Sequence, residues 1–150
     1  MENIAKEEIA ALRQGNIGRL FQRAARAYSD LALVKLQEYG HEGLTLFHTA
    51  LISNLDLEGT RITTLADRAG VSKQAMGQLV ADLEQRGYIE RTPDPNDGRA
   101  TLVQFTEQGW AFLQDAYQVK QAIEAEYAEI LGEVGMNTLW ELLKKLIDTA

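Results

Sequence analysis

The sequence predicts a mainly α fold with a small β wing (α+β), in which a winged helix-turn-helix is flanked by N- and C-terminal helices. Three observations support this fold class. Two amphipathic helical stretches within residues 61–86 are joined by a Gly-Val-Ser turn. Two short β-prone runs follow within residues 88–105, around the segment TPDPNDGR, which holds both prolines of the chain. Apolar residues at helical spacing fill long stretches on either side of this unit.

The first helix of the helix-turn-helix is expected to follow a short strand at residues 61–63. Thr63 or Thr64 can cap this helix with a hydroxyl oxygen, and Asp67 favours its first turn. Gly70 stands where the chain leaves the helix, a position that often requires positive φ. The side chain of Val71 is then expected to fill the corner before the second helix.

The second helix is expected to be capped by Ser72 and to run to about Arg86, with Gly87 ending it. Its two faces differ in character. The apolar face recurs at spacings of three and four and comprises Ala75, Met76, Leu79, Val80 and Leu83. The opposite face comprises Lys73, Gln74, Gly77, Gln78 and Ala81.

This opposite face carries side chains that can recognise DNA bases. Glutamine can bond bidentately to adenine, and lysine can bond the O6 and N7 atoms of guanine. Gly77 keeps the helix surface low, so that the helix can enter a groove deeply. Two alternatives stand beside this interpretation. One is an ordinary solvated amphipathic helix, and the other is a helix-turn-helix of the kind that binds only proteins.

The hairpin expected after the second helix has its strands at residues 88–91 and 100–105. The Pro, Asn and Asp-Gly residues between them favour a turn. Arg99 stands at its tip, where an arginine can enter the narrow minor groove. Asp94 and Asp97 would repel phosphate if they were free, so we expect them to hold Arg91 or Arg99 in position. The alternative is a solvated turn with incidental charges.

These motifs together resemble those of the MarR-type winged-helix transcription regulators. The matching features of the wing are Gly87, Asp97-x-Arg99 and Phe105-Thr106-x-x-Gly109. The matching features upstream are Leu44-Thr45, Leu65-Ala66, Val71-Ser72 and Leu83-Glu84-x-x-Gly87. The resemblance spans nearly the whole chain. Two departures are Gly98, where many members carry a second basic residue, and the KQAMGQ run of the second helix, which leaves the operator sequence open.

A DNA-binding function assigns a role to each polar residue of this unit. Thr63 or Thr64 and the amides that follow are expected to hold a phosphate at the start of the first helix. Arg91 and Arg99 are expected to make the contacts of the wing. The residues expected to face the major groove are Ser72, Lys73, Gln74, Gly77 and Gln78.

The flanking helices carry more apolar surface than one small winged domain can cover. We therefore expect a single MarR-like domain at residues 1–150 that forms a homodimer. Its parts are an N-terminal dimerisation segment at 4–40, the winged helix-turn-helix at 44–105 and C-terminal dimerisation helices at 106–150. Members of the resembled family dimerise through these same terminal helices. The alternative is that the helices fold back on their own domain.

The C-terminal segment is expected to begin with a long helix capped by Thr106. Its apolar positions repeat nearly as a heptad over about 28 residues, or roughly 42 Å. Gly132 and Gly135 are expected to end this helix, and a last helix follows. A dimer would place two second helices about 34 Å apart and predicts a pseudo-palindromic operator in double-stranded DNA.

A small-molecule effector is implied by the resemblance. In similar regulators a small molecule, often aromatic or phenolic, binds between the dimerisation helices and the DNA-reading unit. The candidate lining residues here are Tyr28, Phe47, His48 and Trp110. Each has the alternative role of an ordinary core or boundary side chain. His41 is expected to lie in solvent.

The net charge of −7 is unusual for a protein that binds DNA. Residues 61–105, however, hold six of the fifteen basic residues and six of the 22 acidic residues, so the acidity lies outside the predicted reading unit. DNA binding depends on the local face, because electric fields are screened over about 8 Å at physiological salt. The acidic charge and Gly98 favour an alternative function, a winged-helix module that binds a protein partner, whereas Arg99 and the glutamine-rich face oppose it.

Composition excludes several other classes of function. The chain has no cysteine, and two isolated histidines with scattered carboxylates predict neither a metal site nor a cofactor. No nucleophile–base motif or phosphate loop indicates an enzyme. No apolar run reaches the roughly eighteen residues of a membrane span, and the N-terminus lacks a secretion signal. We therefore predict a cytoplasmic, dimeric, sequence-specific transcription regulator, a repressor released by a small aromatic effector.

Overall fold

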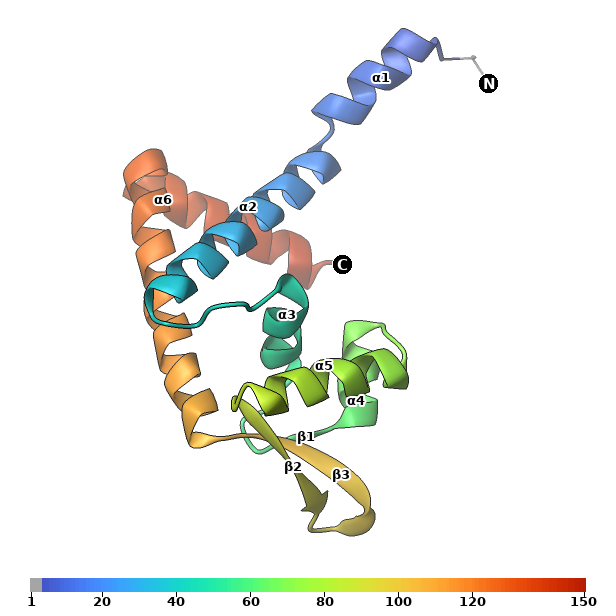
Figure 1. Cartoon of the computed structure of the whole chain (residues 1–150). Coiled ribbons are helices and arrows are strands. Elements are labelled where there is room, and N and C mark those ends of the chain that lie inside the picture. Colours follow the sequence, from blue (N-terminus) through green and yellow to red (C-terminus); the bar gives the residue numbers. More distant parts are fainter. Residues whose placement is uncertain (1–3) are drawn as a thin grey trace.

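The computed structural model describes residues 4–150 and confirms a mainly helical fold with a small wing (Figure 1). The helices are α1 Lys6–Gly15, α2 Ile17–Glu38, α3 Leu46–Asn54, α4 Ile62–Ala69, α5 Lys73–Gln85 and α6 Glu107–Asp148. The strands are β1 Thr60–Arg61, β2 Ile89–Asp94 and β3 Asp97–Phe105. Helices α4 and α5 with the three strands form the winged helix-turn-helix.

The long helices lie at one end of the molecule and the wing at the other (Figure 1). Helix α2 packs against α6, and α3 lies between this pair and the helix-turn-helix. Helix α1 continues from the start of α2 and projects away from the body. The DNA-reading unit and the expected dimerisation helices are therefore spatially separate parts of one fold.

Side-chain caps define where most of the helices begin. Ser72 Oγ accepts a hydrogen bond from the amide of Ala75 at 3.1 Å, and Thr106 Oγ1 accepts one from the amide of Gly109 at 3.0 Å. Each bond satisfies an amide that has no partner within its helix. Both predicted caps are confirmed, and they fix the first residues of α5 and α6.

Helix α4 begins differently from the prediction. Its N-cap is Arg61, which makes no side-chain cap, so Thr63 and Thr64 lie within the first turn and neither of them caps the helix. The reason is the preceding strand, which occupies Thr60–Arg61 and not residues 61–63. Its pairing with Val103 and Leu102 of β3 holds Arg61 in an extended conformation directly before the helix.

The turn between α4 and α5 confirms one prediction and corrects two. Gly70 adopts the left-handed conformation expected of it, with φ of 65°. Val71 does not fill the corner, because its side chain is 38% exposed. Asp67 lies in the second half of α4 and not in its first turn. Leu65 and Ala66 supply the buried face of α4 instead.

The wing is an antiparallel sheet with strand order β1-β3-β2. Its two long strands extend further toward the tip than residues 88–91 and 100–105. Ile89 pairs with Phe105 at the base, and Asp94 pairs with Asp97 beside the tight turn. Pro93 is accommodated because β2 is an edge strand, and the register shifts between Pro93 and Asp94.

The core joins the reading unit to the long helices. Met76, Val80 and Leu83 of α5 are buried as predicted, whereas Leu79 is only partly buried. They belong to one continuous cluster with Leu36 of α2, Ile89 and Val103 of the wing, and Phe112, Val119 and Ile123 of α6. The reading helix is therefore held on a rigid support.

Helix α6 contains a break that divides it into two segments. Gly132 has φ of 75° and ψ of 159°, which is not helical, and helical structure resumes immediately afterwards. The predicted end of the first segment is therefore confirmed at Gly132, whereas Gly135 lies inside the second segment. The apolar stripe changes its environment across this break: Ile123 is buried, but Ile130 and Val134 are largely exposed.

Candidate nucleic-acid interface

Helix α5 presents the predicted reading residues on its solvent side. Lys73, Gln74 and Gln78 are exposed, Gly77 is half-buried, and the capping residue Ser72 is exposed at the helix start. The opposite side of the same helix is packed into the core. This arrangement leaves hydrogen-bonding side chains free on one face of a rigidly supported helix, as reading DNA in the major groove requires.

Gly77 has no structural role that would require glycine. A Cβ atom built on this residue would meet no heavy atom within 4 Å. Glycine inside a helix costs about 1 kcal/mol relative to alanine. The absence of a packing reason is consistent with the predicted reason, which is a low surface where the helix approaches DNA.

The wing tip is organised by aspartate–amide hydrogen bonds. The backbone amide of Arg99 donates to Asp97 Oδ1 at 3.1 Å, and the amide of Asn96 donates to Asp94 Oδ1 at 2.9 Å. Asp97 therefore shapes the turn through the backbone and does not hold a guanidinium. The side chain of Arg99 is exposed at the start of β3, where a positive charge is free to meet DNA.

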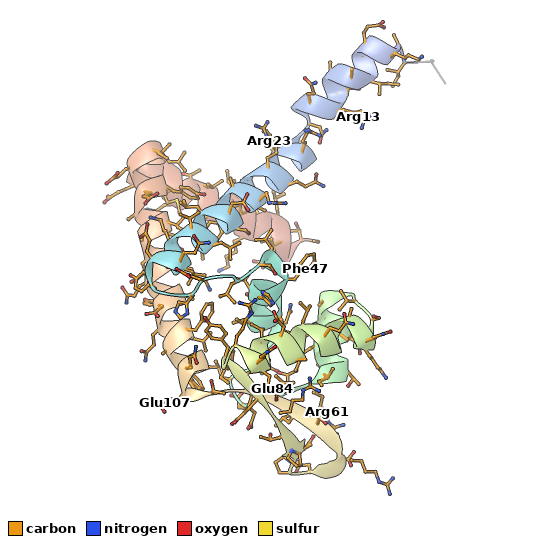
Figure 2. All side chains as sticks on the ribbon, in the orientation of Figure 1. Arg13, Arg23, Phe47, Arg61, Glu84 and Glu107 are labelled. Atoms are coloured by element: carbon orange, nitrogen blue, oxygen red, sulfur yellow. The ribbon has the colours of Figure 1, made fainter. Side chains whose placement is uncertain are left out.

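The predicted partners of the wing aspartates were wrong. Asp94 is bonded by Arg61, whose Nε lies 2.8 Å from Asp94 Oδ2, and not by Arg91 or Arg99. Figure 2 shows Arg61 between α4 and the wing. Arg91 instead lies against Glu84 of α5, which accepts a hydrogen bond from the Arg91 amide at 3.0 Å. A contact of the Arg91 guanidinium with DNA would have to compete with Glu84.

Asp94 is buried and stays ionised for a local reason. The hydrogen bond from the backbone amide of Asn96, followed by the bond from Arg61, holds the pKa of the Asp94 carboxyl below its usual value. These two bonds join the turn of the wing to the start of α4. Sequence reasoning missed Arg61 because it lies 33 residues from its partner, and no local pattern marks the pair.

Thr63 and Thr64 lie in the first turn of α4, the former exposed and the latter half-buried. Their hydroxyls are therefore near the amides at the start of this helix, although they do not cap it. A second ion pair holds the last turn of this helix. Arg68 donates to both carboxylate oxygens of Asp56, at 2.9 and 3.0 Å. A phosphate contact at the start of α4 stays a prediction.

The four candidate effector residues do not come together. Phe47 is 70% exposed at the start of α3 (Figure 2). Trp110 is 45% exposed and packs beside Phe105. His48 is buried and bonded to the reading helix, through Asp82. Tyr28 is the one candidate that lines the pocket between α2, α3 and α6.

That cavity has a volume of about 210 Å³ and lies between α2, α3 and α6. Apolar side chains of all three helices line most of it, including Leu36, Ile52 and Phe112. Its polar lining residues include Tyr28, Thr49 and Lys120. Burial and the nearby carboxylate of Glu124 raise the pKa of Tyr28, so its hydroxyl is neutral and able to donate a hydrogen bond.

His41 was predicted to lie in solvent, but it is buried. Its side chain is bonded on both sides, to Tyr88 Oη at 2.9 Å through Nδ1 and to Asp115 Oδ2 at 2.8 Å through Nε2. Phe112 packs edge-on against the same ring. His41 therefore ties the loop after α2 to the wing base and to α6.

Within residues 4–150, no group of three or more His, Asp or Glu side chains is arranged to hold a metal ion. No helix in the same part of the chain is long and apolar enough to cross a membrane.

A solvent-facing helix on an apolar support, with a β wing beside it, defines a winged helix-turn-helix DNA-binding protein. A sequence model described as "MarR family" matches residues 42–100, which contain α3, the helix-turn-helix and most of the wing. The chain belongs to the MarR family of winged helix-turn-helix transcription regulators.

Curated relatives are similar to most of the chain. The transcriptional activatory protein BadR of Rhodopseudomonas palustris is 27% identical over 150 residues, which cover 97% of this chain and 85% of the relative. The HTH-type transcriptional regulator MhqR of Bacillus subtilis is 26% identical, with 85% of this chain and 89% of the relative covered. The multiple antibiotic resistance protein MarR of Escherichia coli is 35% identical over 49% of this chain and 51% of the relative.

Solved structures show the same fold. The reduced form of MarR from E. coli superposes with a TM-score of 0.75 at 26% identity, over 88% of this chain and 96% of that one. A Cys-to-Ser variant of MarR complexed with operator DNA gives a TM-score of 0.70 at 25% identity, over 96% and 99% of the two chains. The protein is thus a DNA-binding transcription regulator, which argues against the alternative of a module that binds only proteins.

Proposed function

We propose that this regulator is a homodimeric repressor that binds a pseudo-palindromic operator and is released by a small aromatic effector. The observation that carries the proposal is the apolar surface of the terminal helices. On α1 and the start of α2, the exposed apolar residues are Ile9, Leu12, Ile17, Leu20 and Phe21. On the end of α6, they include Ile130, Val134, Trp140, Leu146 and Ile147.

A monomer would leave these side chains in water. The end of α6 and the start of α2 border an open groove of about 600 Å³ that is almost entirely apolar, with Phe21, Tyr127 and Trp140 among its walls. Contiguous exposed apolar surface of this kind marks an interface in soluble proteins. A second copy of the chain is the natural occupant, because a two-fold axis lets each copy cover the other's groove.

Dimerisation would give DNA recognition its geometry. Two reading helices related by a two-fold axis fit successive major grooves when they are about 34 Å apart, one turn of B-DNA. The operator would then consist of two inverted half-sites. Ser72, Lys73, Gln74, Gly77 and Gln78 are proposed to face the major groove, and Arg99 the minor groove.

The effector site is proposed at the cavity between α2, α3 and α6. Its apolar walls suit a single aromatic ring, and its volume of about 210 Å³ excludes large ligands. The Lys120 ammonium would pair with a carboxylate, and the Tyr28 hydroxyl would donate to it. Because α3 connects this cavity to the helix-turn-helix, occupancy would shift the two reading helices relative to each other.

The proposal is tested by titrating the protein against its own upstream intergenic DNA, with unrelated duplex as competitor and at two salt concentrations. We expect saturable binding that survives the competitor, with two chains per site. Binding no tighter than to the unrelated duplex would contradict operator recognition at that locus, and genome-wide selection of bound fragments would then decide whether an operator exists elsewhere.

Effector release is tested in the same assay with benzoate as the probe and benzyl alcohol as its uncharged counterpart. We expect benzoate to weaken operator binding more than benzyl alcohol does, and Lys120→Gln to remove this difference. A reporter gene under the same upstream DNA gives the sign of regulation. Higher expression without the regulator supports a repressor, and lower expression contradicts it.

A further inference from the structure

His48 occupies an unusual position for a polar side chain, buried between two helices and bonded to both. It is the third residue of α3, and its Nδ1 atom lies 2.9 Å from the backbone amide of Thr45, which caps the same helix. Its Nε2 atom lies 2.5 Å from Oδ2 of Asp82 on the reading helix α5. The ring therefore connects the start of α3 directly to α5.

The geometry fixes the protonation of the ring. The Thr45 amide is a donor, so Nδ1 must accept and carries no proton. Nε2 then carries the proton and donates it to the carboxylate of Asp82. The two nitrogens of His48 therefore have different partners, and neither bond can be made by the other nitrogen.

The charged groups around this ring hold Asp82 in place. Arg86 donates from Nε to the same Asp82 oxygen at 3.1 Å, and its Nη1 reaches the carbonyl of Glu42 before α3. The hydrogen bond from Arg86, followed by that from His48, lowers the pKa of Asp82, which stays a carboxylate. The C-terminal third of the reading helix is therefore fastened to the start of α3 by side chains that lie outside the apolar core.

An adjoining side of α3 lines the pocket between α2, α3 and α6. Thr49, which follows His48 directly, lines the cavity together with Ile52 and Ser53. A displacement of α3 would therefore act on the reading helix through the bond from His48 to Asp82. This bond is the polar connection from α3 to the solvent side of α5.

We propose that His48 is a positioning residue for DNA recognition: through Asp82 it sets the orientation of the reading helix relative to α3, the helix that borders the cavity. The inference rests on the proposed operator binding and adds the side-chain pair through which the orientation of α5 is controlled. A rigidly oriented reading helix affects binding to specific bases far more than binding to phosphates, which tolerates rotation of the helix.

One variant separates the two bonds of His48. Glutamine is a favoured residue at the third position of a capped helix, where its side chain accepts from the cap amide. His48→Gln therefore keeps the bond to Thr45 and loses the bond to Asp82. Asp82→Ala removes the same link from the other side. Asp56→Ala is the matched control, because it removes a carboxylate that is bonded to Arg68 of α4 and not to the reading helix.

Operator affinity is the first measurement, compared with affinity for unrelated duplex. We expect His48→Gln to weaken operator binding by about tenfold while leaving binding to the unrelated duplex unchanged. The double variant His48→Gln/Asp82→Ala should lose no more specificity than Asp82→Ala alone, because both substitutions break one link. Full operator affinity in His48→Gln, or additive losses in the double variant, would overturn the inference.

Amide hydrogen exchange in the DNA-free protein tests the same link without an operator. We expect faster exchange along α5 in His48→Gln and Asp82→Ala, and wild-type exchange along α5 in Asp56→Ala. Nitrogen chemical shifts of the His48 ring should report a proton on Nε2 in the wild type. Unchanged exchange in α5 would reject the positioning role. A wild-type protein that binds no operator would contradict the proposed function alone, and the exchange data would still decide this inference.

Discussion

The guanidinium of Arg61 is bonded to the carboxylate of Asp94, with Nε 2.8 Å from Oδ2, and this pair joins the start of α4 to the far end of β2. The same carboxylate accepts the amide of Asn96 in the turn of the wing. One buried side chain therefore fixes the wing both internally and against the helix-turn-helix. The relative placement of wing and reading helix depends on this residue.

Asp94→Asn is expected to change how the stability of the wing depends on pH. Because the pKa of Asp94 is lowered in the folded protein, its contribution to stability is fully present above the usual aspartate value of about 3.9 and is lost as pH falls through the lower, folded value. The asparagine variant lacks this titration. Thermal unfolding should therefore show a lower midpoint at pH 7 and a smaller further decrease on acidification to pH 3.

Asp97→Asn is the control for that experiment, because Asp97 accepts the backbone amide of Arg99 and does not bond to Arg61. The variant removes the same charge from the wing. If both variants flatten the pH dependence equally, general charge repulsion and not the Arg61–Asp94 pair controls the acid stability of the wing.

Arg99→Ala is expected to weaken binding to every DNA sequence and to lower the dependence of affinity on salt. An arginine that neutralises phosphate releases about one counterion, so the slope of log K against log salt should fall by about one. Arg23→Ala is a suitable control, because Arg23 lies on α2 at the opposite end of the molecule from the wing (Figure 2). A salt slope in Arg99→Ala equal to that of the wild type would remove Arg99 from the interface.

Gln74→Ala should act on particular base pairs only. Gln74 is exposed in the first turn of α5, where a bidentate contact to adenine is worth about 1–3 kcal/mol of discrimination. The loss should therefore be concentrated at one position of each half-site. Binding of the variant to a library of operators with single base changes gives the measurement. A uniform loss across all positions would assign Gln74 to the backbone.

Gly109→Ala is expected to destabilise the fold strongly. A Cβ atom on this residue would lie 2.0 Å from the carbonyl oxygen of Tyr88, so the first turn of α6 and the base of the wing would have to separate. Such overpacking costs about 3 kcal/mol. Gly15→Ala is the control, because a Cβ atom there meets nothing within 4 Å. Equal unfolding midpoints in denaturant for the two variants would contradict the close approach.

Local chemistry explains what was predictable from the sequence. Ser72 and Thr106 cap helices, and Gly70 ends one, because each interaction lies within a few residues of its own position. The buried face of α5 follows in the same way from its helical spacing. The Phe-Thr-x-x-Gly motif also has a local cause: Thr106 caps the helix at whose start Gly109 leaves room for the Tyr88 carbonyl.

The parts that sequence reasoning missed all depend on partners distant in the chain. His41 is buried because Tyr88 and Asp115 approach it from two other elements. Helix α4 begins earlier than predicted because the pairing of β1 with β3 ends at Arg61. The four side chains proposed to line an effector site all carry aromatic rings, but they lie in different parts of the fold. Composition alone does not show where α2, α3 and α6 leave a cavity.

Gly77→Ala separates the stability of the reading helix from its function. The added methyl group meets no neighbour within the folded chain, and alanine is favoured over glycine in a helix interior. We therefore expect the free energy of unfolding to rise by about 0.5–1 kcal/mol. If the low surface at Gly77 lets α5 enter the groove, the same variant should bind operator more weakly, because the methyl group would stand between the helix and the bases.

Stability and operator affinity should thus change in opposite directions in Gly77→Ala, a result that a general folding defect cannot produce. Both are measured on one preparation, by denaturant unfolding and by titration with operator DNA. Ala81→Gly is the complementary control, because Ala81 is exposed on the same helix one turn further on. Ala81→Gly should lower stability. If lower stability by itself raised operator affinity, this variant would bind operator more tightly, and we expect that it does not. Higher stability with unchanged affinity in Gly77→Ala would show that α5 does not approach DNA closely at this residue.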